Sequence, residues 1–250
     1  MTDPKALTRA AIILTVIATG LGRLLLGDAY RSYVRPSMFV PLLLSALAIA
    51  GLALWTAFGF DDGDDAAAGE HGHEDHGHAH GGLPRIAWWL IVPFACVAIV
   101  PLRPLGSSSV RSSGANQAVT HRAEWPVEDP PAADGTMSLL DFVSQVVNDP
   151  AHPVDGEVRL TGFVQAQQDG GFVLARFVMT CCAADAQPLL VTVLWDDEPP
   201  PKDAWATVTG THLPAAADTA PEERIEAENI VVEASSVEVI DQPADPYETP

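Results

Sequence analysis

The chain has 250 residues, of which 48% are hydrophobic, and a formal charge of -20 at pH 7. This length fits either one large domain or a membrane portion followed by a small soluble domain. A strongly acidic chain with positive mean hydropathy must keep its apolar and acidic residues in different segments, and the order of the residues shows this separation directly. A single soluble domain of evenly mixed composition is therefore excluded.

Three apolar runs with few charges come first in the chain, and each can cross a bilayer. We predict transmembrane helices over residues 10–26, 37–60 and 86–102. Pro93 and Pro101 suit a membrane helix better than a soluble one, although a buried core helix remains the alternative for the third run. A cleavable signal peptide is the alternative for the first run, because Lys5 and Arg9 precede it.

The distribution of Lys and Arg gives two opposite indications about orientation. With three spans, the first loop and the segment after the third span lie on one side and carry more Lys and Arg, so the positive-inside rule favours a cytoplasmic carboxyl-terminal domain. The basic residues before the first helix argue for the reverse. We therefore expect a multi-pass protein of the cell membrane and leave its orientation open.

Residues 61–82, between the second and third predicted spans, form a loop rich in histidine and acidic residues. Five of the eight histidines of the chain lie within ten residues here. Imidazole and carboxylate groups are ligands for zinc and other divalent transition metals, and the absence of periodicity predicts a labile site that collects several ions. A solvated acidic linker is the alternative. The candidate ligands are His71, His73, His76, His78, His80, Glu74 and Asp75.

A linker and a compact domain follow the third predicted span. Residues 103–135 are rich in Ser, Pro, Gly and Ala and are typical of a flexible linker. From Ser138 the apolar residues recur at helical spacing, Asp141 completes a pattern similar to a capping box, and Pro150 ends the helix. We place the folded domain over 136–240 and a short tail over 241–250.

Five short strands are predicted within this domain. They cover residues 157–165, 172–179, 189–195, 205–211 and 230–240, with an irregularity near Ser235 in the last. Asp169-Gly170-Gly171 forms a hairpin turn between the first two. Gly162 and Gly210 lie where strands must bend, which favours a small closed barrel of the OB type. The expected fold class is thus an α + β membrane protein with three helices and an OB-like domain.

The sequence Cys181-Cys182-Ala183-Ala184-Asp185 is the second chemical signal. Adjacent Cα atoms lie about 3.8 Å apart, too close for an unstrained disulfide. If the strand from residue 172 continues to Cys182, the two thiols point to opposite faces and cannot share one ion unless the chain turns there. Three interpretations stay open: buried packing, a metal-binding thiolate with Asp185, and a redox or nucleophilic cysteine. Arg176, a charged residue in an apolar strand, can pair with Asp185.

The acidic domain excludes a nucleic-acid partner and shows no standard catalytic motif. Only four Lys or Arg residues follow residue 123, against 24 acidic residues, so the basic groove that binds single-stranded nucleic acid is missing. No CxxC motif, Gly-rich phosphate loop, G-x-S-x-G elbow or HExxH stretch occurs. We therefore do not expect an enzyme.

The order of these features resembles the YcgQ-like family of permease subunits. The likeness rests on the spans, the histidine-rich loop, Gly162-Phe163-Val164, Ala175-Arg176-Phe177, the segment Cys182 to Asp185, and Asp245-Pro246-Tyr247. It implies that Cys182 and Asp185 are the family's cysteine and acid, that Arg176 supports them, and that Cys181 is a variable neighbour. It also implies a larger multi-span permease as partner.

The function expected from the sequence is an accessory subunit of a membrane permease for a divalent transition metal, with zinc as the metal. The three spans carry no carboxylate or histidine at mid-depth, so an ion path of their own is not expected and a partner is required. Two alternatives stay open: a membrane-anchored thiol enzyme or redox protein using Cys182, and a structural module that only docks the permease.

Overall fold

A computed structural model describes residues 4–26, 29–58, 103–110, 116–119, 132, 134–149, 154–215, 223 and 225–249. The chain divides into two compact units. Unit 1 is Met1–Tyr30 with Ser37–Leu102, and unit 2 is Arg31–Pro36 with Arg103–Pro250. Six of the residues between the first two helices, Arg31–Pro36, thus belong to the second unit.

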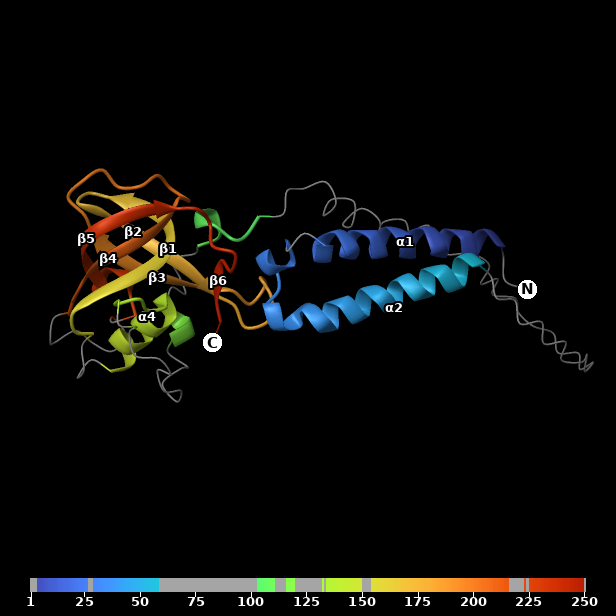
Figure 1. The fold of residues 1–250 in the computed structure, drawn as a ribbon, viewed down its shortest axis with the longest axis horizontal. Coiled ribbons are helices and arrows are strands. Elements are labelled where there is room, and N and C mark those ends of the chain that lie inside the picture. The colour runs from blue at the N-terminus through green and yellow to red at the C-terminus, as the bar shows by residue number, and fades with distance from the viewer. Residues whose placement is uncertain are drawn as a thin grey trace, which may run out of the picture. The chain divides into compact units, whose positions relative to one another are not determined.

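Unit 1 contains the two helices α1 (Pro4–Leu26) and α2 (Phe39–Phe58), which pack against one another (Figure 1). The stretch Pro36–Thr56 is long and apolar enough to cross a membrane, while the apolar stretch of α1, Ile12–Leu25, is shorter. Helix α2 keeps most of its apolar side chains exposed, including Leu44 and Trp55, which suits a lipid environment.

Hydroxyl side chains in both helices donate hydrogen bonds to the backbone of their own helix. Thr19 Oγ1 donates to the carbonyl of Thr15 at 2.8 Å, and Ser45 Oγ donates to the carbonyl of Pro41 at 2.8 Å. Such bonds keep hydroxyl groups paired where water is absent. The predicted helices at 10–26 and 37–60 thus correspond to α1 and α2, whereas the predicted span 86–102 and the histidine-rich loop 61–82 lie outside the described residues.

Unit 2 begins its globular part with helix α4 (Leu139–Asn148), where the sequence predicts a helix. Ser138 is the N-cap: its Oγ accepts from the backbone N–H of Asp141 at 2.9 Å and donates to the Asp141 carboxylate at 2.6 Å. This confirms the predicted cap, which satisfies an otherwise unpaired N–H of the first turn. The apolar face of α4 is buried against the sheet.

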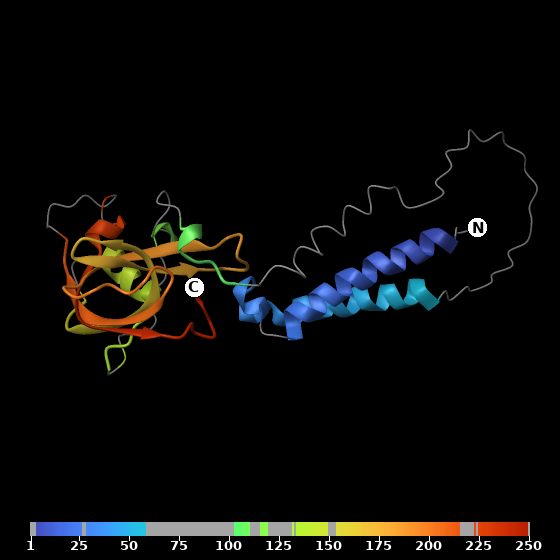
Figure 2. The same cartoon turned by 90° about the horizontal axis from the view of Figure 1, so that it is seen from above.

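Six strands form one mixed sheet in unit 2. They are β1 (Glu157–Gln168), β2 (Gly171–Val178), β3 (Gln187–Leu194), β4 (Trp205–Leu213), β5 (Val231–Ile240) and β6 (Tyr247–Glu248). The order is β1-β4-β5-β3-β2-β6, and β1 also pairs with β2. The pairs β3–β5 and β2–β6 are parallel, and the others are antiparallel. Figure 2 shows the strands curving around the core of the unit.

Local sequence signals set the turn and the bulge of this sheet. Asp169 and Gly170 form the turn between β1 and β2, and Gly170 has a φ of 79°, a conformation that glycine adopts without strain. The register between β4 and β5 shifts so that Ser235 is the extra residue, at the predicted irregularity. A Cβ at Gly162 would lie 2.6 Å from the carbonyl oxygen of Ala175, so the close approach of β1 to β2 at this point depends on glycine.

The sheet buries apolar side chains on both faces, which produces two clusters. The first joins α4 to one face of the strands and includes Phe142, Phe172, Leu174 and Val191. The second, on the other face, gathers aromatic residues: Phe163, Phe177, Trp205 and Tyr247, together with Val173, Ala175, Met179 and Leu190. Strand β2 contributes to both clusters because its successive side chains alternate between the faces.

Segments that the sequence assigns to a linker and a tail belong to unit 2 where the structure describes them. Asn116 and Val119 are fully buried, and Asn116 bonds the backbone of Leu190 through both polar atoms of its side-chain amide. At the other end, Tyr247 and Glu248 form β6 and are buried. The described parts of 103–135 and 241–250 are therefore structural elements of the domain. Apolar side chains from both parts pack on the aromatic face of the sheet and remove it from water.

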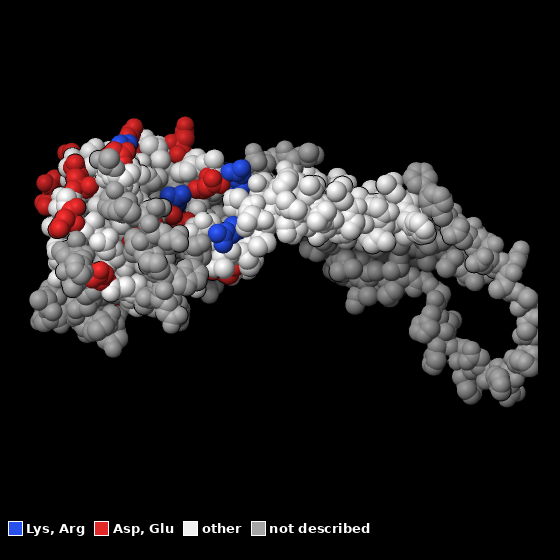
Figure 3. Space-filling view, turned by 60° about the horizontal axis from the view of Figure 1, so that its bottom comes forward, with Lys and Arg blue, Asp and Glu red and all other residues white. Residues whose placement is uncertain are grey.

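Charge is distributed unevenly over the described surface. Figure 3 shows acidic side chains scattered over unit 2 with a few basic ones among them, while the visible side chains of the two helices are almost all uncharged. This is the separation of apolar and acidic segments that the composition predicts.

Candidate metal site

The loop between β2 and β3 is built around the carboxylate of Asp185. Its Oδ1 accepts from the backbone N–H of Thr180 at 2.9 Å, and its Oδ2 accepts from those of Cys181 at 2.9 Å and Cys182 at 3.2 Å. The N–H of Asp185 in turn donates to the carbonyl of Cys182 at 3.0 Å. An aspartate that accepts from nearby backbone N–H groups stabilises a tight turn. The strand therefore ends at Val178, and residues 180–185 form a turn.

This turn brings the two thiols together. Cys181 Sγ lies 3.7 Å from Cys182 Sγ, and both cysteines are free. Cys181 is exposed and Cys182 is half-buried. The strand geometry that would separate the side chains is thus absent. The physical reason is the Asp185 carboxylate, which accepts hydrogen bonds from three backbone N–H groups. These bonds turn the chain where a continuous strand would otherwise go on. Buried packing, one of the three interpretations left open, does not apply to Cys181, because its side chain is exposed.

Cys181, Cys182 and Asp185 together form a set of three potential metal ligands. One ligand atom from each lies within 4.8 Å of the others. Two thiolates bound to one tetrahedral zinc ion at about 2.3 Å lie about 3.8 Å apart, close to the observed sulfur separation of 3.7 Å. Three protein ligands leave one tetrahedral position for water or another group. The arrangement can therefore hold a zinc-like ion with little movement of its side chains.

The electrostatics of the loop favour a proton on Cys181 when no ion is bound. The hydrogen bond to Asp185 raises the pKa of the Cys181 thiol to about 12, and the neighbouring Cys182 thiol acts in the same direction. Partial burial works to raise the pKa of Asp185, but the hydrogen bonds from the Cys181 thiol and the three backbone N–H groups outweigh it, so that this pKa is lowered. A bound cation would take the place of the thiol proton, so binding releases protons.

Residues 33–35 pair with this loop, and no pattern in the sequence points to them. The N–H of Arg35 donates to the carbonyl of Cys181 at 3.1 Å, and the N–H of Ala183 donates to the carbonyl of Tyr33 at 2.8 Å. Val34 and Cys182 form an isolated antiparallel bridge. Backbone bonds between segments so distant in the chain leave no pattern in the sequence, because they involve groups common to all residues.

Arg176 pairs with a different carboxylate from the one expected from the sequence, which was Asp185. Its guanidinium forms an ion pair with Glu248 at 3.0 Å and donates to the carbonyl of Asp245 at 2.8 Å. Glu248 Oε1 also accepts from the N–H of Leu139 at 3.3 Å. Arg176 therefore joins β2, β6 and the start of α4, whereas the carboxylate of Asp185 is occupied by its own loop.

The remaining predicted ligands cannot be placed beside this loop. The histidine-rich stretch, with His71, His73, His76, His78, His80, Glu74 and Asp75, lies outside the described residues. Among the described residues, His212 is buried beneath α4, where its ring meets the ring of Phe142 edge-on at 5.5 Å. Burial lowers the pKa of His212, so its imidazole is a neutral core group.

Fold and site together define a class: a protein with an apolar, membrane-length helix and an α+β domain whose sheet carries an exposed thiol and carboxylate cluster. The chain belongs to the DUF1980 family. Residues 10–116 match the DUF1980 N-terminal domain and residues 136–248 match the DUF1980 C-terminal domain. No curated protein and no solved structure gives a match.

Proposed function

We propose that this protein is a multi-pass accessory subunit of a cell-membrane permease for a divalent transition metal, and that its C-terminal domain binds the ion through Cys181, Cys182 and Asp185. The observation that carries the proposal is the approach of two thiols and a carboxylate to within 4.8 Å at an accessible turn. Burial is not needed to explain the pair, since Cys181 is exposed. Thiolates together with a carboxylate are ligands for zinc and similar ions.

Zinc is the metal that best fits this set. Magnesium and calcium take oxygen ligands and would leave both thiols unused. Zinc accepts sulfur and oxygen ligands in a tetrahedral site, and its open fourth position would let an ion be exchanged rather than locked in. The histidine-rich residues 71–80 supply a second, more flexible set of ligands on the same chain. Two ligand sets with an open position suit transfer of an ion better than permanent storage.

The pairing of β1 with both β4 and β2 supports an OB-like barrel for the C-terminal domain. The pairings run β1-β2-β3-β5-β4 and return to β1, so these five strands have no free edge among themselves. The parallel pair β3–β5 fits the partly open Greek-key barrel of that fold. In such a barrel the β2–β3 loop that carries the cysteines lies at one end, open to a partner.

A larger multi-span permease as partner follows from the resemblance to the YcgQ-like family and from the composition of the described helices. Helices α1 and α2 carry hydroxyl groups that are already paired within each helix and no carboxylate at mid-depth. Transported cations need polar groups at the middle of the membrane. The ion path therefore belongs to another chain, with this protein acting beside it.

Cys181 does not suit the nucleophile of a thiol enzyme, the alternative that the sequence leaves open for Cys182. A nucleophilic cysteine needs a lowered pKa, and the Asp185 carboxylate raises the pKa of the Cys181 thiol to about 12. Metal binding overcomes the same obstacle because the ion itself stabilises the thiolate.

Cobalt titration of the full chain in detergent tests the proposal. Thiolate ligands give Co²⁺ intense charge-transfer absorption, whereas imidazole and carboxylate ligands do not. A variant with His71, His73, His76, His78 and His80 all changed to alanine should keep this absorption, and zinc should displace the cobalt. Adding Cys182→Ser or Asp185→Ala to that variant should weaken binding at least tenfold.

The matched control is Cys96→Ser, which removes the third cysteine of the chain. It should leave the cobalt absorption unchanged. If the five-alanine variant shows no thiolate absorption at millimolar cobalt, the proposed site is wrong. If Cys96→Ser abolishes the absorption, the thiol ligand lies elsewhere in the chain.

A further inference from the structure

The connection between α1 and α2 is built into the C-terminal domain. Residues 31–36 belong to unit 2, although they lie between the two helices of unit 1 in the chain. Backbone hydrogen bonds of Tyr33 and Arg35 lie on both sides of the bridge between Val34 and Cys182. The segment thus pairs with the β2–β3 loop like a short strand, over 140 residues away in the sequence.

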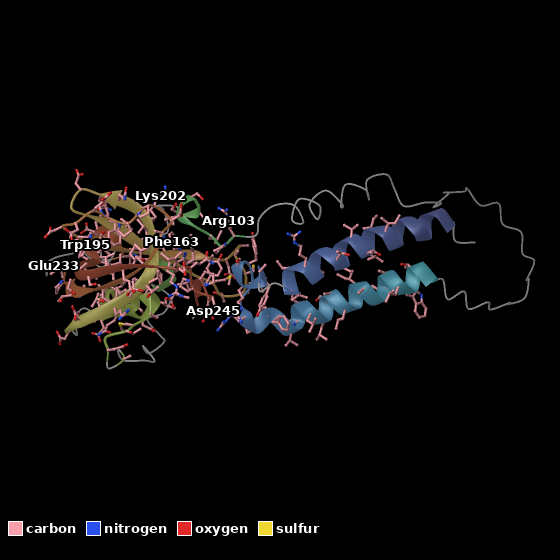
Figure 4. The ribbon with its side chains drawn as sticks, turned by 45° about the horizontal axis from the view of Figure 1, so that its top comes forward. Arg103, Phe163, Trp195, Lys202, Glu233 and Asp245 are labelled. Atoms are coloured by element: carbon pink, nitrogen blue, oxygen red, sulfur yellow. The ribbon has the colours of Figure 1, made fainter. Side chains whose placement is uncertain are left out.

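Side chains of the C-terminal segment hold the same connection from a second direction. Arg31 forms an ion pair with Asp245 at 2.8 Å, and Asp245 lies at the edge of the domain beside the segment that precedes α2 (Figure 4). The Tyr247 hydroxyl donates to the carbonyl of Ser32 at 2.7 Å and accepts from the N–H of Leu105 at 2.9 Å. Two separate parts of the domain therefore bind the same short connection.

We propose that the α1–α2 connection and the C-terminal domain lie on the same face of the membrane, and that the residues following α2 emerge on the opposite face. Helix α1 ends at Leu26 and α2 begins at Phe39, so the short connection between them lies on one face of the membrane. Residues 31–36 are part of this connection and lie on the same face. Their backbone pairing with residues 181–183 then places the domain on that face. Because α2 is long and apolar enough to cross, its end at Phe58 lies on the opposite face.

This topology separates the two ligand sets of the proposed function. The cysteine loop lies on the face of the α1–α2 connection, and the histidine-rich residues that follow α2 begin on the other. Ions collected on one face would have to pass a membrane path to reach the thiols. The topology rests on backbone contacts and on α2 as a span, and it stands or falls without regard to metal binding.

The bridge itself is tested by cross-linking within the full chain in membranes. In a Cys96→Ala, Cys181→Ser background, Val34→Cys places a thiol opposite Cys182. Partners across an antiparallel bridge have Cα atoms about 4.5 to 5.5 Å apart, within the range of a disulfide. After mild oxidation and cleavage at a protease site inserted in residues 61–82, the two fragments should stay joined until reduced. The control adds Cys182→Ser and should separate. Separation in the test variant as well would overturn the pairing.

The faces are tested by labelling single cysteines in intact cells and in permeabilised cells with a maleimide that does not cross membranes. Ser37→Cys and Asp197→Cys report the connection and the domain, since both positions are exposed, and Ala67→Cys reports the residues after α2. The first two should label under the same condition and the third under the other. If Ser37→Cys and Asp197→Cys label from opposite faces, or all three label from one face, the proposed topology is wrong.

Discussion

At the scale of single residues, Asp185 decides the geometry of the candidate site. One carboxylate accepts from the N–H groups of Thr180, Cys181 and Cys182 and also holds the Cys181 thiol. The same group is thus a turn former and a potential ligand. The two sulfur atoms already lie beside this carboxylate, so an ion could bind all three groups with little loss of conformational entropy in the loop. Substitutions at Asp185 should therefore alter the chemistry of Cys181 even without metal.

We predict that Asp185→Asn makes Cys181 more reactive in metal-free protein. The hydrogen bond to the Asp185 carboxylate raises the pKa of Cys181 to about 12, and removal of its negative charge should bring that pKa down towards the ordinary value, about 8.5. In a background with Cys181 as the single cysteine, the rate of alkylation at pH 8 should rise at least tenfold. The rate is followed with iodoacetamide across pH 7 to 11. An unchanged profile would show that the carboxylate does not hold the thiol.

We predict that His212→Leu raises the free energy of unfolding by about 1 kcal/mol at pH 7, because neither ring nitrogen of buried His212 has a hydrogen-bond partner among the described residues. Burial lowers its folded pKa, below the unfolded value of about 6.5. The stability that this difference gives is present above pH 6.5 and is lost as the pH falls through the folded pKa. Denaturant titrations at several pH values should show a shallower loss in the variant. An equally steep loss would assign the pH dependence to another group.

At the scale of elements, the last strand closes the structure around a buried ion pair. Strand β6 adds only two residues to the sheet, Phe177 pairing with Tyr247 and Val178 with Glu248. Glu248 also forms an ion pair with Arg176 through its side chain. Both side chains are largely buried, with 11% of Glu248 and 14% of Arg176 exposed. Loss of one partner would leave the other charge buried without compensation, which is costly. A strand of two residues is thus stabilised by its side chains.

Glu248→Ala should lower the free energy of unfolding by about 3 kcal/mol. The matched control is Glu238→Ala, which removes the exposed partner of Arg159 at 3.5 Å and should cost less than about 1 kcal/mol. Chemical denaturation of the full chain in detergent, followed by the fluorescence of its tryptophans, measures both variants. Equal costs would mean that burial of the Arg176 pair does not matter.

At the scale of the whole molecule, the short connection between α1 and α2 serves two structures at once. It links two apolar helices in the chain and pairs with the β2–β3 loop of the domain. Any ligand that ordered the cysteine loop would therefore also act on residues attached to both helices. These backbone contacts thus link the cysteine loop to the residues that join α1 and α2.

Arg35→Pro should weaken cobalt or zinc binding at the cysteine loop three- to tenfold, because proline cannot donate the N–H that holds the carbonyl of Cys181. Arg35→Ala is the control: it also removes the side chain but keeps the N–H, so it should bind more tightly than Arg35→Pro. Affinities are measured in the five-alanine histidine variant, so that only the cysteine loop contributes. Equal affinities for the two variants would show that the connection does not position the loop.

Many elements of the fold follow from the local pattern and composition of the chain. Helices α1, α2 and α4, the Ser138 cap, the Asp169-Gly170 turn, five strands and the bulge at Ser235 all lie where periodicity, capping and turn chemistry place them. These features depend on residues close together in the chain, whose preferences can be read from their order. The sequence also places Cys181, Cys182 and Asp185 within one short segment.

Contacts between side chains and backbone segments that are far apart in the chain appear only in the folded structure. It turned the chain at residues 180–185, bringing Cys181 beside Cys182, and it gave Arg176 the carboxylate of Glu248 in place of Asp185. It also joined residues 33–35 to the cysteine loop and made the ends of the predicted domain, at Asn116 and Tyr247, part of the fold. The physical reason is that backbone pairing and the burial of an exposed sheet face can be satisfied by any suitable segment, and only packing selects the one that does so.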